Sequence, residues 1–374
     1  MNTVYFDSAA TAIPLESAKE AAANAFHVFG NPSSVHSAGL NAKFLIDNAR
    51  KSVSAALYCK PEEIIFTGCG SEGNNQAIFG LAKLRARRSK RIITDDSEHP
   101  SVSLTLAQLE GIGYEVVRIS TKNGVLDIEQ LENELSLGAA FVAIMLVNNE
   151  TGAKYDIPAV RRAIDKSGCG ALLFCDAVQG FLKVENPREI VKNCDVASVS
   201  AHKIGGLKGV GALYIKSGIK LPAFIHGGGQ EGGLRSGTEN VVGISAFGAA
   251  CSEFPKFSAH ISSLYDKAVE LLQPYGDILK LNIPRNHVKS ILSVSINGVR
   301  SEVMLNALDL HGICISAGSA CSARKANSST LVAYGLTKAE IEGTVRISFG
   351  AYNTLSEVEF LVEKLIETAK KLKR

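Results

Sequence analysis

Two charged residues carry the clearest chemical signal in this sequence. Asp176 follows the apolar run 171–175, and Lys203 comes shortly after a second strand-like run, 195–200. A lysine amine can hold the cofactor pyridoxal phosphate (PLP) as a Schiff base, and an aspartate keeps its pyridine nitrogen protonated, so that the ring acts as an electron sink. Taken singly, such residues are ordinary turn aspartates and solvated lysines. As a pair they predict PLP chemistry, provided that other motifs supply the remaining contacts.

A glycine-rich segment from Gly68 to Gly73 offers a phosphate site and also an alternative function. It matches G-x-G-x-x-G between an expected strand and an expected helix, and Asp95 ends the next strand, as a dinucleotide site requires. Glycine with Ser71 at a helix N-terminus nevertheless suits any phosphate, including that of PLP. An NAD-dependent oxidoreductase using this loop is therefore the alternative, although such an enzyme has no use for Asp176 and Lys203 together.

From about residue 60 to 216, short apolar segments alternate with helical patterns. This alternation is typical of a mainly parallel sheet covered by helices on both faces. We expect helices at 74–88 and 157–166. The expected strands are 63–67, 91–94, 115–119, 141–146, 172–176, 195–200 and 211–215. Ligands gather at the carboxyl ends of strands in such sheets, and Asp176 and Ser200 lie at such ends.

A chain of 374 residues is longer than a single hydrophobic core usually supports. The alternation of expected strands and helices also changes near Pro255. We predict a large PLP-binding α/β domain over residues 15–254 and a smaller α+β domain over 1–14 and 255–374. The smaller domain would contain strands at 290–296, 313–316 and 344–349 and a final helix that opens with a capping box from Ser356 to Glu359.

Composition excludes several classes of protein. With 46% hydrophobic and 21% charged residues the chain reads as an ordinary globular protein, and a net charge of +3 argues for neither nucleic acid nor membrane binding. The N-terminus carries no secretory signal pattern, so a cytoplasmic enzyme is the default expectation. None of the eight cysteines forms a C-x-x-C pair, and no metal site is predicted. Cys175 and Cys194 read as small buried hydrophobes.

A set of motifs follows in one order along essentially the whole chain, and together they resemble the cysteine desulfurases, the NifS/IscS-type branch of the PLP-dependent class V aminotransferases. The resemblance implies an aspartate aminotransferase-like fold. The motifs are Val4-Tyr-Phe-Asp7-Ser-Ala-Ala-Thr11, Gly30-Asn-Pro-Ser-Ser34, Glu98-His99, Asn148-Asn149-Glu150, Asp176-Ala-Val-Gln179, Ser200-Ala-His202-Lys203, Gly227-Gly-Gly-Gln-Glu231, Arg235-Ser-Gly-Thr238, Ser316-Ala-Gly-Ser-Ala-Cys321-Ser322 and Val345-Arg346-Ile-Ser-Phe-Gly350.

The resemblance assigns roles around the cofactor ring. Lys203 is implied to hold the cofactor and to move the proton on the substrate α-carbon. Asp176 is implied to pair with the pyridinium nitrogen, and Gln179 to contact the phenolic oxygen. His99 is implied to stack on the ring and to assist proton transfer; alternatively, it caps the helix that Pro100 begins.

Further roles concern the phosphate and the substrate. Thr238 is implied to reach the PLP of the other subunit of a homodimer. Arg346 and Asn149 are implied to receive the substrate carboxylate, for which a guanidinium fork is well suited, with Asn149 also near the cofactor. The residues implied to hold the phosphate are Gly70, Ser71, Ser200 and His202.

Cys321 separates this family from plain aminotransferases. It lies among serine, alanine and glycine residues that cannot pack a core, so we expect an exposed thiol that can become a nucleophilic thiolate. The resemblance implies that Cys321 attacks the sulfur of L-cysteine and becomes a persulfide while alanine is released. The sulfur would pass to an iron–sulfur scaffold or a tRNA-thiolation protein. The alternatives are another class V aminotransferase or lyase, and a non-catalytic relative.

Overall fold

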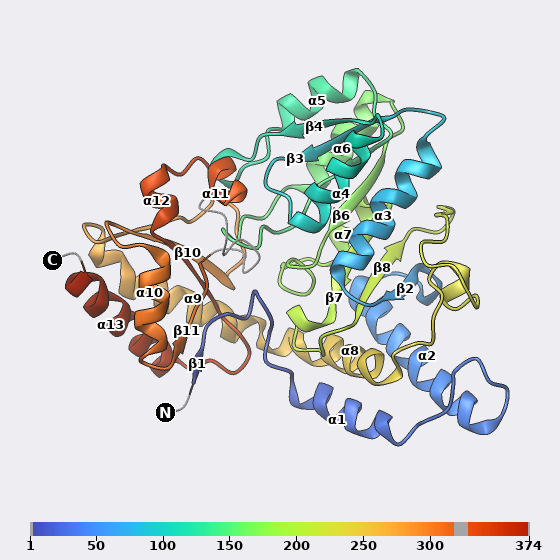
Figure 1. Ribbon diagram of the computed structural model, residues 1–374, viewed down its shortest axis with the longest axis horizontal. Helices are drawn as coiled ribbons and strands as arrows, with labels where there is room; N and C mark the ends of the chain where they lie inside the picture. The colour runs from blue at the N-terminus through green and yellow to red at the C-terminus, as the bar shows by residue number, and fades with distance from the viewer. Residues whose placement is uncertain (1–2, 318–327, 373–374) are drawn as a thin grey trace.

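The computed structural model describes residues 3–317 and 328–372, and its largest element is a seven-stranded sheet of order β2-β8-β7-β6-β5-β3-β4 (Figure 1). All neighbouring pairs are parallel except those made by β8, which is antiparallel to both β2 and β7. The predicted mainly parallel seven-stranded sheet is confirmed. The strands are β2 (Ile64–Thr67), β3 (Arg91–Asp95), β4 (Glu115–Ile119), β5 (Phe141–Ala143), β6 (Leu172–Asp176), β7 (Val196–Ser200) and β8 (Gly211–Ile215).

Two layers of helices cover this sheet, because alternate strand residues point to opposite faces. Phe141 and Phe174 pack in one apolar cluster with helices α3 (Gly70–Arg85) and α4 (Pro100–Gly111). Their chain neighbours Val142 and Leu173 belong to the other cluster. The helices that contribute to that second cluster include α2 (Ser37–Leu57), α5 (Ile128–Ser136), α6 (Ile157–Ser167), α7 (Arg188–Asn193) and α8 (Val241–Glu253).

Helix α8 packs along both α1 (Glu16–Phe26) and α2, forming the lower layer of Figure 1. The approach of α8 to α2 requires glycine, because a Cβ atom at Gly248 would lie 2.7 Å from the Cα atom of Ala49. No side chain larger than hydrogen fits there without moving a helix. This layer supports the strands whose ends carry Asp176 and Lys203.

The C-terminal part of the chain forms smaller sheets with helices, grouped on the left of Figure 1. Strands β12, β10 and β9 form an antiparallel sheet in that order, and β1 pairs in parallel with β11. The predicted domain limits, 15–254 against 1–14 and 255–374, stay a prediction. The elements are β1 (Val4–Tyr5), β9 (Leu279–Leu281), β10 (Ile291–Ile296), β11 (Ile313–Cys314), β12 (Thr344–Ser348), α9 (Ser258–Leu272), α10 (Ser301–Asp309), α11 (Ser329–Tyr334), α12 (Lys338–Glu342) and α13 (Leu355–Leu372).

Local differences from the expected elements have physical causes. The strand expected at 141–146 ends at Ala143, and the Met145 amide instead donates to the Asp95 carboxylate at 3.3 Å. The predicted capping box of the last helix is wrong by two residues: Thr354 and Glu357 exchange the capping hydrogen bonds, at 2.9 and 3.2 Å. In the part of the chain that the structure describes, no helix combines the length and the apolar character needed to cross a membrane.

Candidate active site

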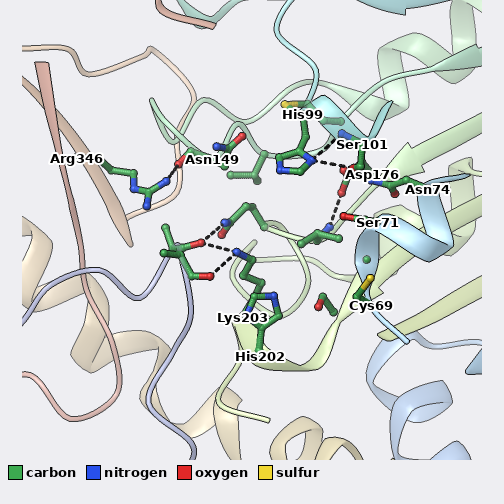
Figure 2. Close-up of a pocket in the computed structure, with 18 residues that line it drawn as sticks. Cys69, Ser71, Asn74, His99, Ser101, Asn149, Asp176, His202, Lys203 and Arg346 are labelled. Carbon is green, nitrogen blue, oxygen red and sulfur yellow. Dashed lines mark hydrogen bonds between the residues drawn. The ribbon is translucent and has the colours of Figure 1, made fainter. Parts of the chain in front are cut away.

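A cavity of about 290 Å³ opens where β6 and β7 end and α3 begins (Figure 2). Nearly all of the predicted site residues meet there although they come from distant parts of the sequence. Thr238 is not among the lining residues, and Cys321 lies outside the described residues. The predicted residues that line the cavity are Gly70, Ser71, His99, Asn149, Asp176, Gln179, Ser200, His202, Lys203 and Arg346.

Asp176 is buried at the end of β6 with both carboxylate oxygens held. The Asn74 side-chain amide donates to Oδ2 at 2.7 Å, and the Val178 backbone amide donates to Oδ1 at 3.0 Å. Asn74 is itself fixed, because its Oδ1 accepts from the Ser198 hydroxyl. The carboxylate therefore has one orientation, and Asn74 is a site residue that the sequence motifs did not identify.

His99 both caps helix α4 and lines the cavity, so the two interpretations of this residue are compatible. The Ser101 backbone amide donates to its Nδ1 at 3.1 Å, which leaves Nε2 as the protonated ring nitrogen. Burial lowers the pKa of His99, and the positive charge of Lys203 lowers it further against the opposing effect of Asp176. The ring is thus neutral near pH 7.

Lys203 follows β7 and reaches back to the first residues of the chain. Its Nζ donates to the carbonyl oxygens of Ala9 and Ala10, at 2.7 and 2.8 Å. The neighbouring His202 is also in the cavity wall, and burial, followed by the charge of Lys203, lowers the pKa of His202 to about 3. Ala9 and Ala10 act here through backbone oxygens, which carry no side-chain signal in the sequence.

The floor of the cavity beside α3 has the properties of a phosphate site. A Cβ atom at Gly70 would lie 2.6 Å from the Val178 side chain, so only glycine lets the backbone approach this closely. The Ser200 hydroxyl and His202 Nδ1 are buried there without a hydrogen-bond partner among the described residues. Unpaired buried polar groups beside a helix N-terminus suit an anion that would complete their hydrogen bonds.

Arg346 reaches the opposite wall from β12 and is almost completely buried. One Nη donates to the Asn149 carbonyl at 2.8 Å and the other to the Asp7 carboxylate at 2.7 Å. Its Nε is buried without a partner among the described residues. The guanidinium is therefore oriented by two protein oxygens and keeps donor capacity that a ligand carboxylate can use.

Comparisons with known proteins agree with the function that this cavity suggests. The family model described as aminotransferase class-V matches residues 4–361. The chain belongs to the class-V aminotransferase family. A cysteine desulfurase of Trichormus azollae is 34% identical over 100% of this chain and 94% of that protein, and a cysteine desulfurase IscS of Clostridium botulinum (strain Hall) is 34% identical over 90% and 86%.

Solved structures of related proteins are also similar to this class-V protein over nearly its whole length. A NifS-like protein superposes with a TM-score of 0.91 at 33% identity, covering 99% of this chain and 100% of the other. A structure described as SspA in complex with cysteine has a TM-score of 0.82 at 31% identity, covering 94% of this chain and 100% of the other. These relatives favour a class-V enzyme over the dinucleotide-binding alternative.

Enzymes of the class-V family use PLP, and the residues of this cavity fit that cofactor. Its monophosphate would satisfy Ser200 and His202 at the N-terminus of α3, and Asp176 offers a carboxylate to a protonated pyridine nitrogen. The individual residue roles, including those of Thr238 and Cys321, stay predictions.

Behind the cavity, the class-V fold buries two neighbouring carboxyl groups, Asp95 and Glu98. Burial raises the pKa of Asp95 to about 6, although the Ser97 amide and hydroxyl donate to it at 2.9 and 2.8 Å. Burial, with the negative charges of Asp95 and Asp176, raises the pKa of Glu98 well above its ordinary value. The folded protein therefore holds protons here that the unfolded chain releases.

We predict that Glu98→Gln flattens the dependence of stability on pH. A raised folded-state pKa gives stability that is complete below the unfolded pKa and is lost as pH rises, by up to about 1.4 kcal/mol per pH unit for one group. Thermal unfolding of the holoenzyme from about pH 5 to about pH 8 should show a smaller loss for the glutamine variant than for wild type. Exposed Glu359→Gln is the control and should follow wild type. Equal slopes for wild type and Glu98→Gln would contradict this interpretation.

Proposed function

We propose that the protein is a cysteine desulfurase that converts L-cysteine to L-alanine and carries the removed sulfur as a persulfide on Cys321. Near full-length similarity to relatives named cysteine desulfurase supports the reaction. The SspA structure, described as a complex with cysteine, supports cysteine as the substrate.

The observation that carries this proposal is that the residues on both sides of the segment containing Cys321 are held next to the cavity. Ser316 pairs with Arg346 of the cavity wall through two backbone hydrogen bonds, at 2.6 and 3.1 Å. Ser328 donates to the Glu150 carboxylate at 2.7 Å, next to Asn149 of the same wall. Both ends are thus fixed beside the cavity. Cys321 is five residues from Ser316 in the sequence, a separation that an extended chain spans in at most about 18 Å, so a thiol at this position has the reach to meet a substrate there.

Different residues of the cavity would bind the substrate carboxylate and the cofactor phosphate. Arg346 would receive the substrate carboxylate through its unused donors, with Asn149 beside it. Gly70, Ser71, Ser200 and His202 would hold the cofactor phosphate.

A second group of residues would serve the proton transfers. When bound, PLP supplies an electron sink for the electrons of the substrate α-carbon. Asp176 would keep the pyridine nitrogen protonated, and Gln179 would contact the phenolic oxygen. Lys203 would take the α-proton and His99, neutral with a proton on Nε2, would assist its transfer.

Cys321 would perform the step that distinguishes the reaction. Its thiolate sulfur forms a bond to the substrate sulfur while the substrate Cβ–S bond breaks, and the electron pair of that bond stays with the three-carbon product. The product takes up a proton and leaves as alanine, and the enzyme keeps both sulfur atoms. An aminotransferase of the same family has no need for this thiol.

The proposal also includes the protein that accepts the sulfur and a location in the cytoplasm. The motif resemblance supports an iron–sulfur scaffold or a tRNA-thiolation protein as acceptor. The described cysteines, which exclude Cys321, are all free thiols, and this suits the reducing cytoplasm.

We also propose a homodimer in which Thr238 reaches the PLP of the partner subunit. Thr238 is exposed and does not line the cavity of its own chain. Its segment is held onto α3, because Arg235 donates to Glu72 at 2.8 Å. Close by, Pro32 of the α1–α2 connection and Glu239 line one hollow, and the two segments lie on the same side of Figure 1. Exposed apolar side chains gather around this connection: Phe26, Phe29, Val35, Leu40 and Phe44.

Charged residues in this apolar region should separate the subunits. Phe29 and Phe44 are 90% and 63% exposed, so Phe29→Glu with Phe44→Glu leaves the core intact but prevents apolar contact with a second copy. Light scattering should give a dimer for wild type and a monomer with weaker PLP binding for the double variant. Leu137→Glu, at an exposed site after α5, is the control and should stay dimeric. A monomeric wild type would contradict the proposal.

Alanine release from L-cysteine tests the reaction. With a reductant that removes persulfide sulfur, wild type should form alanine continuously, and Cys321→Ala should fall to the rate without enzyme, because the thiol that is proposed to accept the sulfur is removed. Cys314→Ala, a partly exposed thiol in the same part of the chain, is the matched control and should keep its activity. Wild-type rates from Cys321→Ala, in a preparation whose visible absorbance shows bound PLP, would refute the proposed nucleophile.

A further inference from the structure

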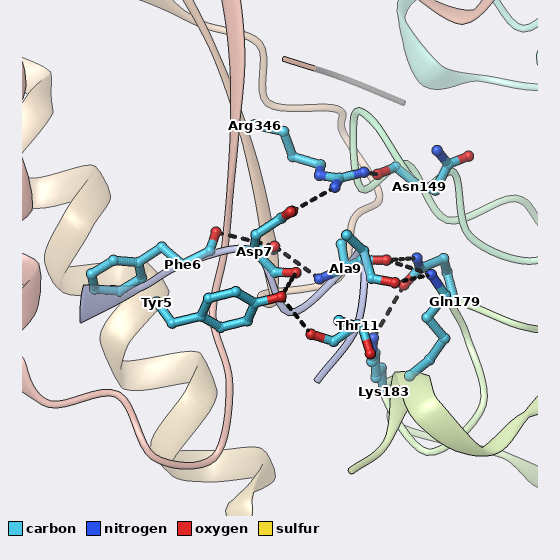
Figure 3. A network of polar contacts seen from close by, with 12 residues as sticks. Tyr5, Phe6, Asp7, Ala9, Thr11, Asn149, Gln179, Lys183 and Arg346 are labelled. Atoms are coloured by element: carbon cyan, nitrogen blue, oxygen red, sulfur yellow. Dashed lines mark hydrogen bonds and ion pairs between the residues drawn. The ribbon is translucent and has the colours of Figure 1, made fainter. Parts of the chain in front are cut away.

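A second lysine, Lys183, lies beside the cavity and has no role in the reaction described above. Its Nζ donates to Gln179 Oε1 at 3.1 Å (Figure 3). Gln179 is buried and lines the cavity, and its Nε2 donates to the Ala9 carbonyl at 2.7 Å. Lys183 is thus linked through one side chain to the same backbone oxygen that holds Lys203.

These contacts determine which end of the Gln179 amide faces which partner. An ammonium group only donates hydrogen bonds, so the atom facing Lys183 must be the amide oxygen. The amide nitrogen then faces Ala9, and only one of its two hydrogens is used by that carbonyl. The second N–H remains available to a ligand in the cavity. If the Gln179 amide turned over, its oxygen would face the Ala9 carbonyl oxygen and its nitrogen would face the Lys183 ammonium. Without Lys183, only the first of these two unfavourable contacts opposes the turn.

We propose that Lys183 is a positioning residue, which orients Gln179 so that an N–H rather than an oxygen meets the phenolic oxygen of the cofactor. The inference rests on the proposed contact between Gln179 and PLP. It assigns to Lys183 a function in setting the electronic state of the cofactor ring, since a donated hydrogen bond stabilises the anionic form of a phenolic oxygen.

The backbone next to Lys183 supports a specific placement of its side chain. Leu182 has φ of 59°, in the left-handed region that a bulky residue rarely occupies. Such strain persists only where surrounding contacts outweigh it, and Leu182 is buried in the large apolar cluster. This turn directs the amine of Lys183 toward Gln179 instead of leaving it in solvent.

The charges around Lys183 are consistent with this role. Burial, and then the positive charges of Lys203 and Arg346, lower the pKa of Lys183 to about 7. A neutral amine can still donate to Gln179 but can also accept a hydrogen bond, so Lys183 orients the Gln179 amide most strictly when it is protonated. Lys183 also lines a surface hollow together with Glu185, Glu189 and other charged groups.

The test compares PLP binding and the visible absorbance of enzyme-bound PLP in four holoenzymes: wild type, Lys183→Met, Gln179→Leu and the double variant. Methionine keeps the length of the stem and removes the donor. We expect Lys183→Met to weaken PLP binding by about tenfold and to shift the pH midpoint of the absorbance change upward. Gln179→Leu should do the same, and the double variant should be no worse than Gln179→Leu, because the two residues act as one unit. Lys183→Arg, which keeps a donor, should restore most of the binding.

Two results would overturn the inference: an absorbance profile and PLP affinity of Lys183→Met equal to those of wild type, or independent, additive effects in the double variant. Lys183→Ala provides the same comparison if the methionine variant does not fold. The readouts need only bound PLP and no turnover. Alanine release in the same preparations separately reports on the proposed desulfurase reaction.

Discussion

The arrangement of the site depends on the hydrogen bonds that residues 7–10 make to both parts of the fold (Figure 3). The Ala9 carbonyl accepts from Lys203 and Gln179 of the large sheet, while the Ala9 amide donates to Ser348 of β12 at 2.9 Å. Two residues earlier, Asp7 holds Arg346. A short stretch of backbone therefore sets the separation between the lysine that would hold the cofactor and the arginine that would hold the substrate.

Burial changes the charge of the ionisable side chains around the cavity. It lowers the pKa values of His99, His202 and Lys183, so these groups carry less positive charge around the cavity than they would in water. Negative charge on a ligand is instead matched by the N-terminus of α3 and by the guanidinium of Arg346. Ser200, His202 and Arg346 each have a buried polar atom without a partner among the described residues, and ligand atoms there would complete the network.

Much of this arrangement could be predicted from the sequence. Strand patterns placed Asp176 and Ser200 at the carboxyl edge of a parallel sheet, and such edges bring together residues far apart in the chain. Asn74 and Ala9 could not be found in this way, because one is a helix residue among several polar neighbours and the other acts through its backbone. The pairing of Asp7 with Arg346 joins residues 339 positions apart and accompanies a backbone bridge between Asp7 and Ser348 at the end of β12, which local patterns do not encode. Strands as short as β1 and β9 leave no periodicity to read.

Mass spectrometry of the enzyme after one turnover can show whether the sulfur of L-cysteine is delivered to Cys321. The holoenzyme would be mixed with a stoichiometric amount of L-cysteine without reductant, alkylated at its thiols and digested. We expect the peptide that contains Cys321 to gain the mass of one sulfur atom and the peptides of the other cysteines to gain none. An unmodified Cys321 together with stoichiometric alanine, or extra sulfur on a different cysteine, would contradict this expectation.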